Sequence, residues 1–187
     1  HGTKLKVVDE FTYLGNCLSN TCNLDSDIVI SKRLAKASSS FGRLWTRVWK
    51  ERGLSSQTKV SVYKAVVLSA LLYGCESWTL YRRQLKQLDQ FHIRCLRKIL
   101  KISRQEHVPN TEILRRANMF GIEAHITKIR LRWAGHVVRM EDHRLPKQLF
   151  HCELSQGERA CGRPILRYKD TLKASPVSYT HLRAHET

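Results

Sequence analysis

The stretch IVISKRLAKASSSFGRLWTRVWK, residues 28–50, decides the fold class of this chain. Its apolar residues recur at alternating spacings of four and three, which places them on one face of an α-helix. They are Ile30, Leu34, Ala37, Phe41, Leu44 and Val48. Basic residues recur similarly on the opposite face, namely Lys32, Lys36, Arg43, Arg47 and Lys50. The sequence therefore predicts a helix that packs on one side and is positive on the other.

Two more helices are predicted beyond Gly53, which ends the first one. The second runs from a cap at Ser55 or Ser56 to a stop at Gly74, because a hydroxyl accepts an unpaired N–H and glycine suits a helix end. The third covers about 80–102. Its predicted buried stripe is Leu85, Leu88, His92, Cys95, Ile99 and Ile102. Its predicted basic stripe is Arg83, Lys86, Arg94, Arg97 and Lys101.

The rest of the pattern completes a mainly α fold. Asn110 is the predicted cap of a short helix at 111–118, and a last helix covers about 122–140. The inward residues of that last helix are Ile122, Ile126, Ile129, Trp133, Val137 and Met140, with Lys128, Arg132 and Arg139 on another face. After Pro146 the periodicity fades. Residues 4–19 alternate weakly, which predicts a short β-hairpin or edge strand before the four to five amphipathic helices.

Charge is the strongest functional signal. Thirty-three Lys and Arg face sixteen Asp and Glu, for a formal net charge of +17. Such a surface repels itself unless a polyanion neutralises it, and nucleic acid is the usual partner because each phosphate contact releases a counterion. A basic helix face can also be simply solvated, but acids would then interleave, and they are scarce on these stripes.

A membrane partner and secretion are not expected. The longest strongly apolar run is Ala65–Tyr73, far short of the roughly 20 residues that span a bilayer. No signal peptide is visible, and the six scattered cysteines form no compact disulfide framework. These features predict a nuclear or cytoplasmic protein.

The tryptophans offer a possible base-stacking surface. Trp45 and Trp133 lie on or beside core stripes, so burial is predicted for both. Trp78 follows a helix stop and is open to either interpretation.

No catalytic residue, metal site, cofactor or small-molecule substrate is predicted. Cys17 and Cys22 form one C-x4-C pair without a second pair at zinc spacing. Asp25 and Asp27 stand where a helix begins, and carboxylates there stabilise the helix dipole. The sequence contains no glycine-rich phosphate loop, H-E-x-x-H or nucleophile elbow.

An ordered series of short segments, from about residue 3 to about 173, resembles the reverse transcriptases of non-LTR (LINE-type) retrotransposons. The segments are FTYLG (11–15), DI (27–28), RLAKA (33–37), LYGCESW (72–78), FH (91–92), CLR (95–97), NTEIL (110–114) and LRWAGHVVRM (131–140). One departure is Arg104, because the family often has Trp after Ile-Ser. That substitution fits a decaying genomic copy.

The resemblance implies a role for each part. Tyr13, Leu14 and Gly15 would belong to the primer grip, within residues 1–20. Residues 21–105 would form a thumb-like helical bundle that follows the template–primer duplex through its backbone. Residues 106–174 would form a basic helical region beyond the thumb. The family's catalytic Asp-Asp turn would lie before residue 1, and no Ala-Asp-Asp occurs in this chain.

The chain is therefore expected to be a non-catalytic fragment of an endonuclease/reverse transcriptase-like protein, and its start at His1 predicts truncation. Residues 177–187, VSYTHLRAHET, resemble a translated sequencing adaptor, so 175–187 are expected to be an artefactual disordered tail.

The residues expected to bind a duplex or RNA–DNA hybrid belong to the primer-grip segment and to three basic stripes. They are Tyr13, Leu14, Gly15, Lys32, Lys36, Arg43, Arg47, Arg94, Arg97, Lys101, Lys128 and Arg132. Two alternatives stay open. One is an independent helical DNA-binding protein, and the other is a retroelement relic without function.

Overall fold

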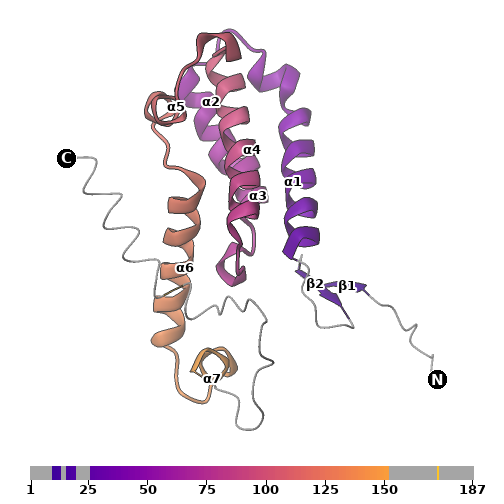
Figure 1. Cartoon of the computed structure of the whole chain (residues 1–187), viewed down its shortest axis with the longest axis vertical. Helices are drawn as coiled ribbons and strands as arrows, with labels where there is room; N and C mark the ends of the chain where they lie inside the picture. The colour runs from indigo at the N-terminus through magenta and orange to yellow at the C-terminus, as the bar shows by residue number, and fades with distance from the viewer. Residues whose placement is uncertain (1–9, 14–15, 20–25, 152–171, 173–187) are drawn as a thin grey trace. The chain divides into compact units, whose positions relative to one another are not determined.

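The computed structural model describes residues 10–13, 16–19, 26–151 and 172 (Figure 1). The described part is mainly helical, as the sequence predicts. The chain divides into two compact units. The first comprises His1–Gly74 with Leu80–Ile122, and the second comprises Cys75–Thr79 with Glu123–Thr187. The predicted division at residues 20, 105 and 174 follows the parts of the resembled family and stays a prediction.

Two short strands precede the helices. Strands β1 (Glu10–Tyr13) and β2 (Asn16–Ser19) pair antiparallel, with Glu10 opposite Ser19. Leu14 and Gly15 lie outside the described residues, as do the predicted tail 175–187 and the basic loop before it.

Helix α1 (Ser26–Arg43) continues into the π-helical segment η1 (Trp45–Trp49). Ile30, Ala37 and Phe41 are buried, in agreement with the predicted apolar face. The prediction for Trp45 is wrong, because its side chain is 39% exposed. A π-helix closes i→i+5 hydrogen bonds, so the wider turn rotates the next side chains away from the α-helical pattern. Trp49 occupies the buried position instead.

The second predicted helix is one continuous rod with a π-helical centre. It comprises α2 (Ser56–Val62), η2 (Tyr63–Leu68) and α3 (Ser69–Leu72). Ser55 is its cap, since its Oγ accepts from the backbone N–H of Thr58 at 3.1 Å. Gly74 follows the rod with φ 78°, a left-handed conformation that glycine adopts without a Cβ penalty.

Helix α4 (Arg82–Leu100) is central to the first unit, because it contacts α1, α2 and α5 (Asn110–Ala117). Its predicted stripe is confirmed at Leu88, His92, Cys95 and Ile99, all buried, while Leu85 is half-buried. Lys101 ends α4 in the left-handed conformation, and the short 3-10 helix η4 (Arg104–Glu106) follows. The prediction for Asn110 is wrong. It is the first helical residue of α5, and Pro109 occupies the cap position.

One polar pair lies inside the core of the first unit. The buried imidazole of His92 lies between the Tyr63 hydroxyl, 2.8 Å from Nδ1, and the Phe120 carbonyl, 3.2 Å from Nε2. A carbonyl can only accept, so Nε2 carries the proton and Nδ1 accepts from Tyr63. Burial raises the pKa of Tyr63 well above 10, which keeps its hydroxyl a donor. The pair links α4 to the rod without leaving either side chain unsatisfied.

The second unit contains the 3-10 helix η3 (Cys75–Ser77), most of α6 (Ile122–Val138) and α7 (Leu145–His151). Arg130 of α6 is buried and donates to the Trp78 carbonyl. Trp78 is buried, and the half-buried Trp133 packs edge-on to Phe150 at 6.4 Å. The sequence reading missed α7. Proline is well suited to the first turn of a helix, so Pro146 lies in the first turn of α7 and does not mark the end of regular structure.

Two buried thiols are expected to resist alkylation in the native protein. Burial raises the pKa of both Cys75 and Cys95 to about 12, and only the thiolate is nucleophilic. Iodoacetamide at pH 8 should therefore leave both unmodified until urea unfolds the chain, as peptide mass mapping would show. Modification of either cysteine at the same rate in native and unfolded protein would contradict this burial.

Candidate nucleic-acid interface

The exposed surface of α1 and η1 carries the first predicted basic stripe. Lys32, Lys36, Arg43 and Arg47 are all exposed, as their position opposite the apolar face requires. Arginine and lysine at three- and four-residue spacing lie one above another on a helix. They can therefore meet consecutive phosphates while the apolar face stays packed.

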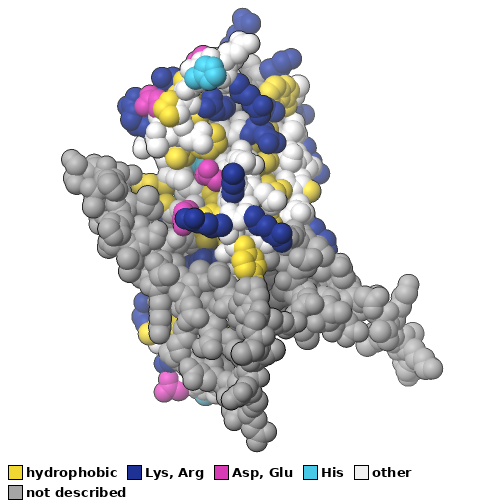
Figure 2. All heavy atoms as spheres, viewed as in Figure 1, with side chains coloured by type: hydrophobic (Ala, Val, Ile, Leu, Met, Phe, Trp, Pro, Cys, Tyr) yellow, Lys and Arg dark blue, Asp and Glu magenta, His cyan; other side chains and the backbone are white. Residues whose placement is uncertain are grey.

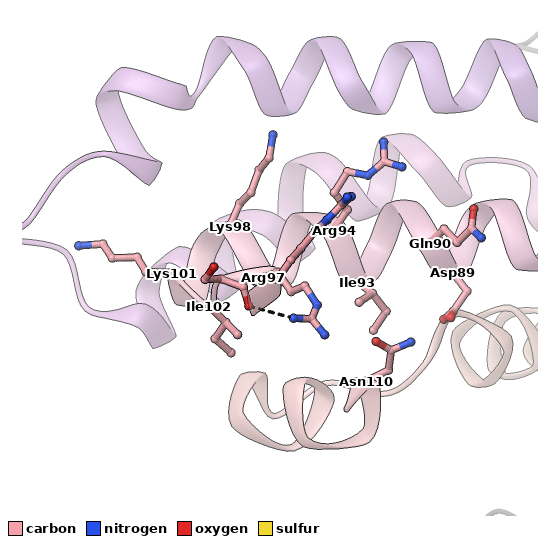
Figure 3. A pocket seen from close by; sticks show the side chains of 11 residues that line it. Asp89, Gln90, Ile93, Arg94, Arg97, Lys98, Lys101, Ile102 and Asn110 are labelled. Carbon is pink, nitrogen blue, oxygen red and sulfur yellow. Dashed lines mark hydrogen bonds between the residues drawn. The ribbon is translucent and has the colours of Figure 1, made fainter. Parts of the chain in front are cut away.

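Helix α4, which carries the second stripe, packs against α1. The ammonium of Lys98 lies 5.4 Å from the centre of the Trp45 ring and 6.0 Å from that of Phe41. Figure 3 shows Arg94 and Lys98 extending from the same side of α4. We call the combined surface the basic face. It comprises Lys36, Arg43, Trp45, Arg47, Arg94, Lys98 and Lys101.

The buried side chain of Lys59 holds the end of η1 in place. Lys59 of α2 is 3% exposed, and its Nζ donates to the carbonyls of Trp49, at 3.2 Å, and Glu51. A cation suits the carbonyl-rich C-terminal end of a helical segment. The Trp49 indole donates to the Phe41 carbonyl at 2.8 Å and stacks on the Phe41 ring at 4.8 Å. These contacts hold the segment that presents Trp45 and Arg47.

Arg97 makes hydrogen bonds that its place in the predicted basic stripe did not indicate. It is half-buried and donates to the carbonyls of Ser103, at 3.4 Å, and Val108. These bonds tie the loop after α4 back onto the helix. Arg97 therefore contributes positive potential from a fixed position, with two of its donors already engaged.

Two carboxylates of the described first unit, Asp89 and Glu112, have partners outside the basic face. Burial raises the pKa of Asp89, while the backbone N–H of Ile122, at the start of α6, lowers it. Glu112 bonds Arg115 at 2.7 Å and Arg116 at 2.8 Å, and these hydrogen bonds lower its pKa to about 2. The two arginines of α5 thus share one carboxylate, whereas no ion pair is seen on the basic face within the described residues. Lys and Arg side chains predominate over carboxylates on the view in Figure 2.

The other predicted residues are placed as follows. Lys128 and Arg132 are exposed on α6 in the second unit. Tyr13 ends β1, and only its backbone is described. The primer-grip prediction for Tyr13, Leu14 and Gly15 stays a prediction, because their side chains lie outside the described part of the structure.

Sequence reasoning missed three residues of this site. Lys98 was hidden because it lies between the two stripes of α4 and not on either. Trp45 was assigned to the core, and Lys59 was not singled out. A lysine four residues after a serine cap gave no sequence signal of burial, because only the tertiary approach of η1 explains it.

The described residues contain no cluster of three or more His, Cys, Asp or Glu side chains that could hold a metal ion. Among the helices the structure describes, none is long and apolar enough to cross a bilayer.

Comparison with known proteins gives one line of similarity. The chain is 26% identical over 175 residues to the uncharacterized transposon-derived protein F52C9.6 of Caenorhabditis elegans. The match covers 91% of this chain and 61% of that relative. No protein-family model matches, and no solved structure matches. The similarity suggests a transposon origin.

Proposed function

We propose that this chain binds the sugar–phosphate backbone of a nucleic-acid duplex through the basic face. One observation carries the proposal. Lys98 approaches the ring of Trp45 and α4 contacts α1, so we take the cations of α1, η1 and α4 to act as one surface. Exposed arginines and lysines without nearby carboxylates attract phosphates and release their counterions. The positions are fixed by packing and by Lys59, which lowers the cost of ordering them on binding.

The transposon-derived relative supports a mobile-element origin, and the segments that resemble LINE-type reverse transcriptases lead to a more specific form of this proposal. In it, the chain is the thumb and post-thumb part of a LINE-type reverse transcriptase, whose parent protein is an RNA-directed DNA polymerase. The natural ligand is then the template–primer hybrid, with Tyr13, Leu14 and Gly15 near the primer end and Lys32, Lys128 and Arg132 adding contacts. The chain itself extends no primer.

The salt dependence of binding tests the proposal. With about five phosphates contacted on B-DNA, log affinity should fall against log salt with a slope of about −4.5. Arg43→Ala should reduce the magnitude of that slope by about one and weaken unrelated sequences alike. Fluorescence anisotropy titrations on several DNA duplexes and an RNA–DNA hybrid would measure both.

Arg115→Ala is the matched control, because it removes the same charge from an arginine already paired with Glu112. Its slope should equal that of wild type. A flat salt response would reject backbone binding and favour a relic without function. A preference for one sequence that Arg43→Ala abolishes would favour an independent DNA-binding protein.

A further inference from the structure

A groove opens beside the C-terminal half of α4 in the first unit (Figure 3). Helix α4 forms one wall, and the segment from Lys101 to Asn110 forms the other. Its volume is about 930 Å³. Five cations line it, namely Arg94, Arg97, Lys98, Lys101 and Arg104. The groove therefore adjoins the basic face through Arg94, Lys98 and Lys101 but extends beyond it.

Hydrogen bonds fix the loop wall before any ligand arrives. Arg97 holds the carbonyls of Ser103 and Val108, and the Ile102 N–H donates back to the Arg97 carbonyl at 3.0 Å. Glu106 accepts from the Ser103 N–H at 2.6 Å, which engages this carboxylate with its own loop. A wall ordered in advance spares a ligand part of the entropy cost of binding.

The lining offers more than charge. Ile93 and Ile102 are buried residues that supply an apolar floor, and Gln90 and Asn110 supply amide groups. Asp89 is the one carboxylate among the described residues that line the groove, and the Ile122 N–H bonds to it. Apolar surface, amides and guanidinium planes are the groups that bind unstacked bases, while the cations suit their phosphates.

The size of the groove selects among nucleic acids. A volume of about 930 Å³ equals a cube about 10 Å on each side. A duplex is wider than its major groove, which is itself about 12 Å wide, so a volume of about 930 Å³ holds no full turn of duplex. A few unpaired nucleotides can enter.

We infer that this groove binds a short single-stranded extension of the duplex that lies on the basic face. The inference rests on the proposed function and adds a second subsite to it. The phosphates of the extension would meet Lys101 and Arg104, and its bases would lie over Ile93 and Ile102 with Asn110 at their edge. The chain would thereby recognise a junction between paired and unpaired nucleic acid.

Four DNA probes test the inference by anisotropy. They are a short blunt duplex, the same duplex with about four unpaired nucleotides at its 3′ or its 5′ end, and a duplex lengthened by about two base pairs. The last adds as many phosphates as the unpaired extension does. Wild type should bind at least one unpaired extension about tenfold more tightly than the lengthened duplex, because only the unpaired nucleotides reach Arg104 and Asn110.

Arg104→Ala combined with Asn110→Ala should reduce that ratio to below about twofold, because both residues line the groove and neither belongs to the basic face. Arg43→Ala should weaken all probes and keep the ratio. Equal wild-type affinity for the unpaired and the lengthened probes would overturn the inference. The salt dependence of duplex binding would then still support the basic face as a duplex-binding surface. Binding of the unpaired nucleotides without any binding of the duplex would overturn the proposed function. The groove would then remain as a binding site for single strands.

Discussion

Replacing Arg43 and Arg47 together by glutamate is expected to weaken duplex binding at least about 100-fold at 0.1 M salt. Both side chains are exposed and lie on the part of α1 and η1 that adjoins Lys98. Two lost phosphate contacts reduce affinity about 60-fold at that salt concentration, and the new carboxylates add repulsion. Anisotropy on an RNA–DNA hybrid and a DNA duplex would measure the loss, with circular dichroism to confirm that the variant folds.

Its matched control reverses two charges elsewhere in the first unit. Lys64→Glu with Arg82→Glu changes the net charge equally, at exposed positions outside the basic face. Because it removes no phosphate contact, it should weaken binding by less than about tenfold. Equal losses in the two variants would mean that net charge alone governs binding, and the basic face would then have no special role.

The second large effect is expected from Lys59→Met, which should lower the free energy of unfolding by about 2–4 kcal/mol. Methionine fills a similar volume but donates nothing, so the carbonyls of Trp49 and Glu51 lose their shared partner. A hydrogen bond from a charged donor contributes about 1.5–3 kcal/mol, and an unsatisfied buried carbonyl adds a penalty. Urea denaturation followed by circular dichroism would give the change in midpoint.

Lys50→Met serves as the control, since Lys50 is the exposed residue directly after η1. It should change stability by less than about 0.5 kcal/mol. If Lys59→Met were equally mild, the buried ammonium would not hold η1 in place. The Lys59 variant should also bind duplex more weakly, because Trp45 and Arg47 lose the anchor beneath them.

The sequence predicted best where one helix keeps one period and packs on one side. In α4, the spacing of Leu88, His92, Cys95 and Ile99 agrees with their burial, because an unbroken α-helix repeats the same face. The same reasoning failed after Arg43. The π-helical turn of η1 shifts the face, so Trp45 is exposed and Trp49 is buried.

Buried cations were the second kind of failure. Arg33, Lys59 and Arg130 are each buried, although periodicity treats every lysine and arginine as a solvent-facing residue. Each has a specific neighbour: Arg33 lies over the Tyr73 ring at 4.8 Å, Lys59 bonds the end of η1, and Arg130 bonds the Trp78 carbonyl. These partners come from other segments of the chain, so a local pattern could not reveal them.

The candidate site was predictable in its charges but not in its assembly. The stripes containing Arg43 and Arg94 follow from helical spacing, whereas their adjacency depends on the packing of α1 against α4. The groove depends on the left-handed turn at Lys101, which folds the loop back along α4. Lysine rarely adopts that conformation, so the sequence contained no turn signal there.

The π-helical centre of the rod has a consequence for insertions and deletions in related chains. A turn that closes i→i+5 hydrogen bonds holds one more residue than an α-helical turn. The segment Tyr63–Leu68 therefore stores a spare residue between α2 and α3. A chain lacking one residue there, for example the exposed Val66, can close as plain α-helix with its ends still paired. We expect alignments of relatives to place single-residue gaps at Tyr63–Leu68 and none inside α4, and the reverse distribution would contradict this.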